Sequence, residues 1–75
     1  MKVKDVLSSD PEVMSGAVVF KGTRVPVDVL FAHLRAGDSL DVFLSDFPTV
    51  ERAQAEAVLE LAADDLKDRV EKAAA

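Results

Sequence analysis

The sequence predicts a mainly α protein with a three-helix, helix-turn-helix core of the homeodomain-like kind, a small N-terminal β-hairpin and a C-terminal helical extension. Two observations predict this fold class. From Val27 onwards, apolar residues recur with a helical period that Gly37 and Pro48 interrupt. Before Val27 this period is absent, and a short β-prone run at residues 17–20 lies between two glycines.

The chain has 75 residues, enough for one domain. A domain of this size buries only about 60% of the surface that its unfolded chain exposes, so it is marginally stable alone. The sequence contains no cysteine and one histidine, which excludes a disulfide framework, a thiolate metal site and a multi-histidine ligand set. Association with another chain is the remaining source of stability, and we therefore expect a homodimer or a complex with a partner.

Nine basic and fourteen acidic residues give a net charge of −5. This balance disfavours non-specific binding to nucleic acid, which depends on a basic surface, although it is compatible with a local basic patch. No apolar run approaches the roughly 18 residues of a membrane span. The segment from Met1 to Asp5 is basic but lacks the apolar stretch of a signal peptide. We expect a cytoplasmic protein without membrane contact.

Residues 1–26 are predicted to be extended, with a turn signal at Asp10-Pro11. The run at residues 17–20 is predicted to pair with Val25 across a turn at Lys21-Gly22-Thr23. Because an isolated hairpin is marginal in water, this hairpin must pack on the helices or on a second chain.

Two helices are predicted next. Their apolar faces share the spacing i, i+3, i+4, i+7: Val27, Leu30, Phe31 and Leu34, then Leu40, Phe43, Leu44 and Phe47. Pro26 suits the first turn of the first helix, and Gly37 is placed to end it. Asp38 or Ser39 caps the second helix, and Pro48 ends it.

Thr49 is a good N-cap, and a third helix is predicted from Val50. Its core-facing positions are Val50, Ala53, Ala57, Val58, Leu61 and Ala62. Nothing after Thr49 breaks a helix, so the C-terminal residues form a separate short helix or continue the third. The predicted organisation is one small domain at 1–63, made of a β-rich arm at 1–26 and a three-helix bundle at 27–63, followed by a C-terminal helical tail at 64–75.

The sequence does not indicate catalysis. His33 is the one histidine of the chain, and histidine is a common general acid or base, but no nucleophile or orienting acid stands at a recognisable spacing from it. We interpret it as a surface or interface histidine. Asp38, Asp41 and Asp46 would suit a metal cluster, but helix capping accounts for the first two. We expect no enzymatic activity, metal, cofactor or small-molecule substrate.

Gly22, Thr23, Arg24 and Pro26 are interpreted as a structural turn. Phosphate-binding loops carry several glycines before a helix N-terminus with free amides, whereas this segment has one glycine and Pro26 lacks an amide. In the structural interpretation, Gly22 supplies a positive φ and Thr23 bonds the turn backbone. Arg24 then pairs with a carboxylate or with carbonyl groups.

Three helices joined by short turns are also compatible with DNA recognition, with the third helix as the recognition helix. Thr49, Arg52 and Gln54 would then face DNA, since arginine suits guanine edges and glutamine suits adenine edges. Glu51 and Glu56 would repel phosphates. A plain helical scaffold fits the same pattern equally well.

The apolar residues Leu59, Leu66 and Val70 are not needed by a three-helix core. One interpretation is a helix whose apolar stripe docks into a groove of a partner protein. The other is a frayed, solvated helix end.

Four segments, taken in order, resemble the domain-of-unknown-function family 433. They are Ser9-Asp10-Pro11-Glu12-Val13-Met14, Val19-Phe20-Lys21-Gly22-Thr23-Arg24-Val25-Pro26-Val27, Leu34-Arg35-Ala36-Gly37-Asp38-Ser39 and Asp46-Phe47-Pro48. The similarity covers residues 5–63, and the segments are specific in combination. Where the family usually has Gly-Gly-Lys-Pro, this chain has Ser15-Gly16-Ala17-Val18.

The resemblance implies a usually dimeric helix-turn-helix fold with a small N-terminal β element. Members are often interpreted as antitoxins of type II toxin–antitoxin pairs, which implies a PIN-like ribonuclease toxin bound through the C-terminal extension and operator DNA bound through the helices. The expected function is therefore an antitoxin-like DNA-binding protein that represses its own operator. The alternative is a homodimeric protein-interaction scaffold that does not bind DNA.

Overall fold

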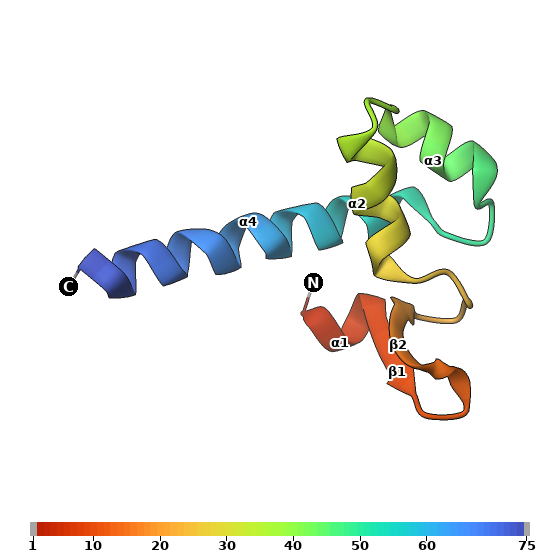
Figure 1. The fold of residues 1–75 in the computed structure, drawn as a ribbon, viewed down its shortest axis with the longest axis horizontal. Helices are drawn as coiled ribbons and strands as arrows, with labels where there is room; N and C mark the ends of the chain where they lie inside the picture. Colours follow the sequence, from red (N-terminus) through yellow and green to blue (C-terminus); the bar gives the residue numbers. More distant parts are fainter. Residues whose placement is uncertain (1, 75) are drawn as a thin grey trace.

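The computed structural model describes residues 2–74, and of Val13, Met14 and Ala74 it describes the backbone alone. In this part the chain forms four helices and a two-stranded antiparallel sheet (Figure 1). The elements are α1 (Val3–Val6), β1 (Leu7–Asp10), β2 (Val13–Phe20), α2 (Val27–Arg35), α3 (Leu40–Asp46) and α4 (Arg52–Ala74). The predicted mainly helical class with an N-terminal hairpin is confirmed.

Strand β1 pairs with β2, and Leu7 lies opposite Phe20 in the register. The chain reverses between the strands, where the Asp10 carboxylate accepts a hydrogen bond from the Glu12 amide at 2.9 Å. Such a bond from an aspartate to the backbone two residues on stabilises a turn. Residues 1–26 are not wholly extended as predicted, because α1 forms a single helical turn before β1.

The predicted pairing of residues 17–20 with Val25 as the hairpin is wrong. It remains as one isolated bridge between Val19 and Pro26 and one hydrogen bond from the Phe20 amide to the Val25 carbonyl at 3.0 Å. Pairing β2 with β1 forms more backbone hydrogen bonds than pairing it with Val25 across a tight corner. This matters because nearly all backbone polar groups in a folded chain are hydrogen-bonded.

Helices α2 and α3 form where the periodicity predicts them. Gly37 follows α2 with a φ of +93°, the left-handed conformation that commonly ends a helix. Ser39 caps α3, and its side chain accepts a hydrogen bond from the Val42 amide at 3.2 Å. Leu30 of α2 and Phe43 of α3 are fully buried, which fixes the faces that the two helices turn inward.

Helix α4 begins at Arg52 rather than at Val50, and Thr49 is not its cap. The Glu51 amide instead donates a hydrogen bond to the side-chain carbonyl of Gln54 at 3.0 Å. A side chain in the first turn that reaches back to the preceding amide satisfies one of the unpaired donors at a helix start. The helix therefore starts where Gln54 can close this contact.

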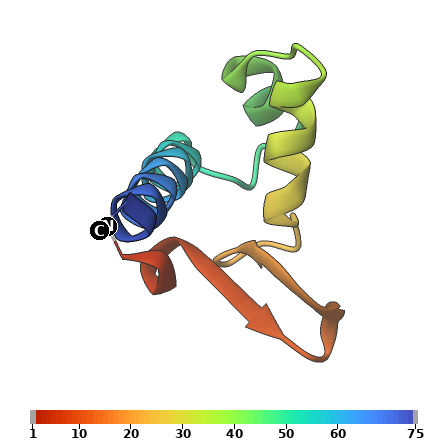
Figure 2. The same cartoon turned by 60° about the vertical axis from the view of Figure 1, so that its left-hand side comes forward.

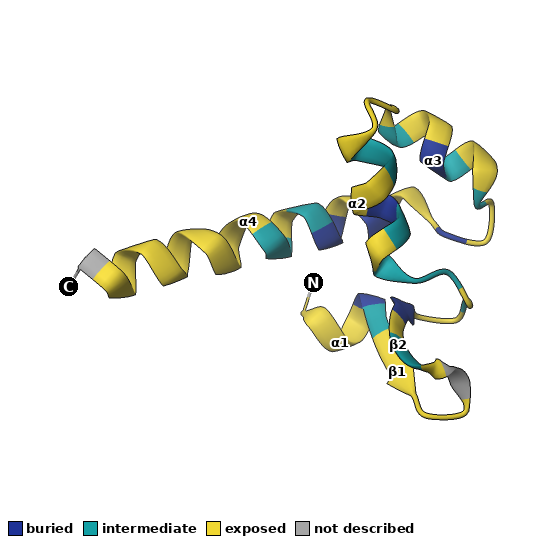
Figure 3. Ribbon diagram, in the orientation of Figure 1, coloured by how far each residue is buried: buried dark blue, intermediate teal, exposed yellow. Residues whose placement is uncertain are grey.

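The second half of α4 projects from the body of the molecule (Figure 1). The helix runs for 23 residues without a break, so the C-terminal tail continues the third predicted helix. Residues 63–73 are all exposed (Figure 3). Figure 2, a view close to the axis of α4, shows α2 and α3 to one side of this helix and α1 beneath it.

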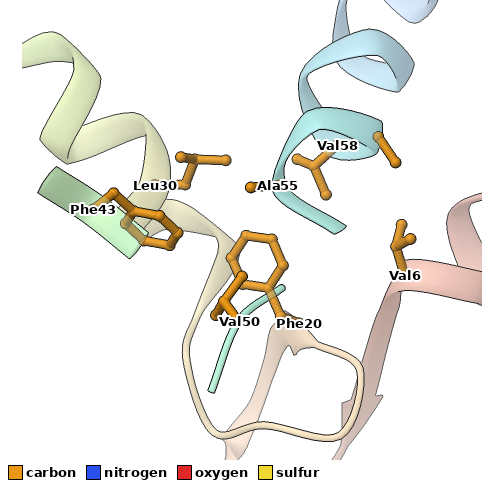
Figure 4. Close-up of a cluster of buried hydrophobic side chains, with 8 residues drawn as sticks. Val6, Phe20, Leu30, Phe43, Val50, Ala55 and Val58 are labelled. Atoms are coloured by element: carbon orange, nitrogen blue, oxygen red, sulfur yellow. The ribbon is translucent and has the colours of Figure 1, made fainter. Parts of the chain in front are cut away.

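The core lies where α1, the hairpin, α2, α3 and the first half of α4 meet (Figure 4). Its buried residues are Val6, Phe20, Leu30, Phe43, Val50, Ala55, Ala57 and Val58. The ring centroids of Phe20 and Phe43 are 5.9 Å apart with the rings tilted at 46°, and this contact joins the hairpin to α3. Two details of the prediction are wrong: Ala53 is exposed while Ala55 takes its place, and Phe31 is 38% exposed.

None of the helices described between residues 2 and 74 combines the length and the apolar character that crossing a membrane requires.

Candidate functional site

The corner between β2 and α2 is held by its own hydrogen bonds. The Thr23 hydroxyl donates to the Phe20 carbonyl at 2.8 Å and accepts from the Val25 amide at 3.0 Å. Gly22 has a φ of +81°, and a Cβ placed there would meet no atom within 4 Å. The backbone conformation, and not crowding, is therefore what favours glycine at this position.

Arg24 is exposed beside this corner, and no carboxylate or carbonyl within residues 2–74 pairs with its guanidinium. The pairing expected for it is thus not found in the described part. Arg24 lines an open groove of about 650 Å³ together with Gly22, Thr23, Val25, Pro26, Phe47 and Thr49. The corner and the loop before α4 therefore share one surface.

Gln54 joins the start of α4 to the corner. Its side-chain nitrogen donates to the Lys21 carbonyl at 3.0 Å, while its side-chain oxygen accepts from the Glu51 amide. The side chain is half-buried. Both of its polar ends are engaged within the chain, so Gln54 is not free to contact an adenine edge without losing these bonds.

Thr49 and Arg52 lie exposed near the start of α4, as the DNA-binding interpretation requires. The Arg52 guanidinium, however, forms an ion pair with the Asp41 carboxylate of α3, and 53% and 77% of the two side chains are exposed. An exposed pair of this kind contributes at most about 1 kcal/mol to stability. Arg52 could therefore exchange Asp41 for another anion at little cost.

His33 connects α2 to α3 and is half-buried, which the sequence did not reveal. Its ring meets the rings of Phe43 and Phe47 edge-on, each at 5.7 Å. The ring nitrogen Nδ1 lies 3.0 Å from a carboxylate oxygen of Asp38, but the two groups are not aligned for a hydrogen bond. Asp46 lies farther off, at 3.9 Å from Nε2.

The three aspartates considered as a metal cluster therefore do not converge on one point. Asp38 and Asp46 lie near His33, whereas Asp41 forms an ion pair with Arg52. Among residues 2–74, no group of three or more His, Cys, Asp or Glu side chains is arranged to hold a metal ion. The environment of His33 is that of a packing residue between two helices.

The tail of α4 carries exposed apolar side chains among charged ones. Leu66 and Val70 are 63% and 68% exposed, and together with Lys67 and Glu71 they line a groove of about 360 Å³. Leu59, predicted with them, is half-buried and packs against the core. Ion pairs along the helix join Asp65 to Arg69 and Asp68 to Lys72, each at 2.9 Å.

A second apolar surface lies on the N-terminal arm. This arm groove has a volume of about 520 Å³ and is lined by Lys2, Val3, Lys4, Leu7, Ser8, Ser9 and Val18. Val3 and Val18 are 55% and 45% exposed. The sequence did not predict the groove, because Val3 and Val18 come together only through the pairing of β1 with β2.

The chain belongs to the family described as "Protein of unknown function (DUF433)", whose model matches residues 7–62. The match includes the hairpin, α2, α3 and the first half of α4, and the exposed tail lies beyond it. The resemblance noted in the sequence is thereby confirmed at the level of the family.

A protein of Sinorhizobium fredii (strain NBRC 101917 / NGR234), "Uncharacterized protein y4eO", is 33% identical to this chain over 48 residues. The match covers 64% of this chain and 22% of that protein, so the chain spans about a fifth of the length of this relative. No solved structure matches the chain.

Proposed function

We propose that this protein is a dimeric antitoxin-type module that acts by binding, and that the tail of α4 is its partner-binding arm. The observation that carries the proposal is the exposure of Leu66 and Val70 on a helical segment that projects from the body. Most helical stability in proteins comes from packing of an amphipathic face, and the exposed second half of α4 has no such packing within residues 2–74. The tail is therefore best stabilised when another protein covers it.

The partner proposed for this arm is a PIN-like ribonuclease toxin. An apolar groove of the toxin would receive Leu66 and Val70, and this contact would neutralise its ribonuclease activity. An amphipathic helix laid in a groove is a common mode of recognition, with anchors at helical spacing. Leu66 and Val70 are the anchors, and Leu59, which packs against the core, lies where this part of α4 meets the body. In this proposal the protein works in the cytoplasm, beside its toxin.

The test is co-purification with the protein encoded by the adjacent reading frame. Deletion of residues 64–75 and the substitution Leu66→Asp are each expected to abolish the complex and the inhibition of ribonuclease activity. Val42→Asp is the matched control, because Val42 is also an exposed apolar residue but lies on α3. A complex that persists after the deletion would remove the tail from the proposal.

DNA binding is the second candidate function, with α2, α3 and the first half of α4 as a helix-turn-helix core that represses its own operator. Exposure of Thr49 and Arg52 at the start of α4 favours it. The Arg52–Asp41 pair and the engaged Gln54 weigh against it. Without DNA binding, the protein is a homodimeric interaction scaffold.

Electrophoretic shifts with the upstream DNA of the protein separate these two alternatives. A specific complex should weaken as salt rises from 50 to 200 mM, because phosphate contacts release counterions. Arg52→Ala should weaken it further, whereas Arg69→Ala is the matched control, since Arg69 is also an exposed arginine paired with an aspartate. If the wild-type protein forms no salt-sensitive complex with this DNA, operator binding is excluded.

A further inference from the structure

Two separate surfaces hold most of the exposed apolar side chains. In the described part of the chain, the large hydrophobic residues with exposed side chains are Val3, Val18, Phe31, Val42, Leu66 and Val70. Four of these six belong to the arm groove or to the tail stripe. We define the tail stripe as Leu66, Val70 and Ala73, which are spaced i, i+4, i+7 along α4. Apolar patches of this kind commonly mark interaction sites.

The tail stripe does not cover the arm groove of its own chain. Helix α4 is continuous from Arg52 to Ala74 and leads away from the hairpin (Figure 1). Val18 on the arm and Leu66 on the tail both stay exposed in the single chain. Covering both surfaces at once therefore requires a second molecule.

The charges of the two surfaces are complementary. Lys2 and Lys4 are exposed at the arm groove. The tail at residues 64–75 carries four acidic and three basic side chains, a net charge of −1. Arg69 and Lys72 are already paired with acidic neighbours on α4. An approaching tail would thus bring net negative charge to a basic rim while its apolar stripe meets the apolar lining.

We propose that the tail stripe of one copy lies in the arm groove of a second copy, and that the second tail returns the contact around a two-fold axis. A two-fold dimer repeats each contact, so one complementary pair of surfaces buries both grooves and both stripes. This inference rests on the homodimer of the proposed function and gives it an interface. A partner protein that binds the tail would compete with the second copy for Leu66 and Val70.

Disulfide trapping tests the interface directly, because the natural chain has no cysteine. Val18→Cys and Leu66→Cys variants are purified separately, mixed under mild oxidation and run on a non-reducing gel. The mixture should give a cross-linked dimer much faster than either variant alone. A Leu66→Cys protein that cross-links with itself as fast as the mixture would overturn the proposal in favour of paired α4 helices.

Sedimentation equilibrium of the uncross-linked proteins is the second arm. Val18→Asp and Leu66→Asp should each raise the dimer dissociation constant about tenfold or more, since each places a charge in an apolar contact. Val42→Asp on α3, at a position about as exposed as Val18, should leave the dissociation constant unchanged. Circular dichroism of each variant confirms that it is folded.

The possible failures are distinguishable. A dimer that forms in the absence of any Val18–Leu66 cross-link overturns this interface and leaves the homodimer standing. A chain that stays monomeric up to about 1 mM, a concentration at which even weak association is visible, overturns both. Binding of a toxin is measured separately, so its absence would count against the proposed function alone.

Discussion

The side chain of Gln54 reaches Lys21, 33 positions earlier in the chain, and its amide nitrogen donates to the Lys21 carbonyl at 3.0 Å. The same side chain closes the start of α4 through the Glu51 amide. One residue therefore sets where α4 begins and ties that point to the end of the hairpin. This explains why Gln54, which the sequence predicts to contact DNA, is half-buried.

Replacing Gln54 should therefore destabilise the fold. Gln54→Ala removes two hydrogen bonds at a helix start and is expected to cost about 1–2 kcal/mol, which lowers Tm by roughly 4–8 °C per kcal/mol in a domain of this size. Thermal unfolding, monitored by circular dichroism, measures this change in Tm. Glu56→Ala, an exposed position on the next part of the helix, is the control. Equal melting of Gln54→Ala and wild type would show that the Lys21 contact contributes nothing.

The Thr23 hydroxyl is expected to stabilise the corner through its two hydrogen bonds, which run to Phe20 and Val25. Thr23→Ala should lower the free energy of unfolding by about 1–2 kcal/mol, because it leaves a half-buried amide without its partner. Thr23→Ser keeps the hydroxyl and should recover most of the loss. Urea denaturation of the three proteins decides the matter, and a serine variant as unstable as the alanine variant would assign the effect to the lost methyl group.

Gly22→Ala tests backbone strain without a packing effect, since the space around the position is open. A residue with a Cβ pays about 1–2 kcal/mol in the left-handed region, so the free energy of unfolding should fall by that amount. Gly22→Asn should be milder, because asparagine tolerates this region better than alanine. If alanine and asparagine destabilise equally in urea titrations, the positive φ is not the source of the effect.

The helices that could be predicted are those in which the spacing of apolar residues agrees with the residues that start or end a helix. Pro26, Gly37 and Ser39 mark the ends of α2 and α3 at positions that the apolar spacing also favours. The start of α4 could not be predicted this way. Thr49 is the better cap by local preference, but Gln54 gains a second bond to Lys21 that is visible only in the folded chain.

The hairpin and the arm groove depend on a pairing that the sequence does not specify. Strand β1 has only Leu7 as a partly buried apolar residue, and Ser8 and Ser9 are exposed, so its alternation is too short to read. The sequence alone therefore favours a nearer β-prone residue, Val25, as the partner. Once β1 lies beside β2, Val18 joins the arm groove, which no local pattern could have indicated.

The Arg52–Asp41 pair gives the sharpest test of DNA binding. If Arg52 contacts operator DNA, Asp41 competes with the DNA for it, and Asp41→Asn should raise affinity at 50 mM salt by about three- to tenfold. Its effect on stability should stay below about 1 kcal/mol, because the pair is exposed. Asp65→Asn removes the same charge from an Asp–Arg pair on the tail and is the control. Fluorescence anisotropy with labelled operator DNA would show an equal gain in both variants if only net charge matters, and no gain in either if α4 does not meet DNA.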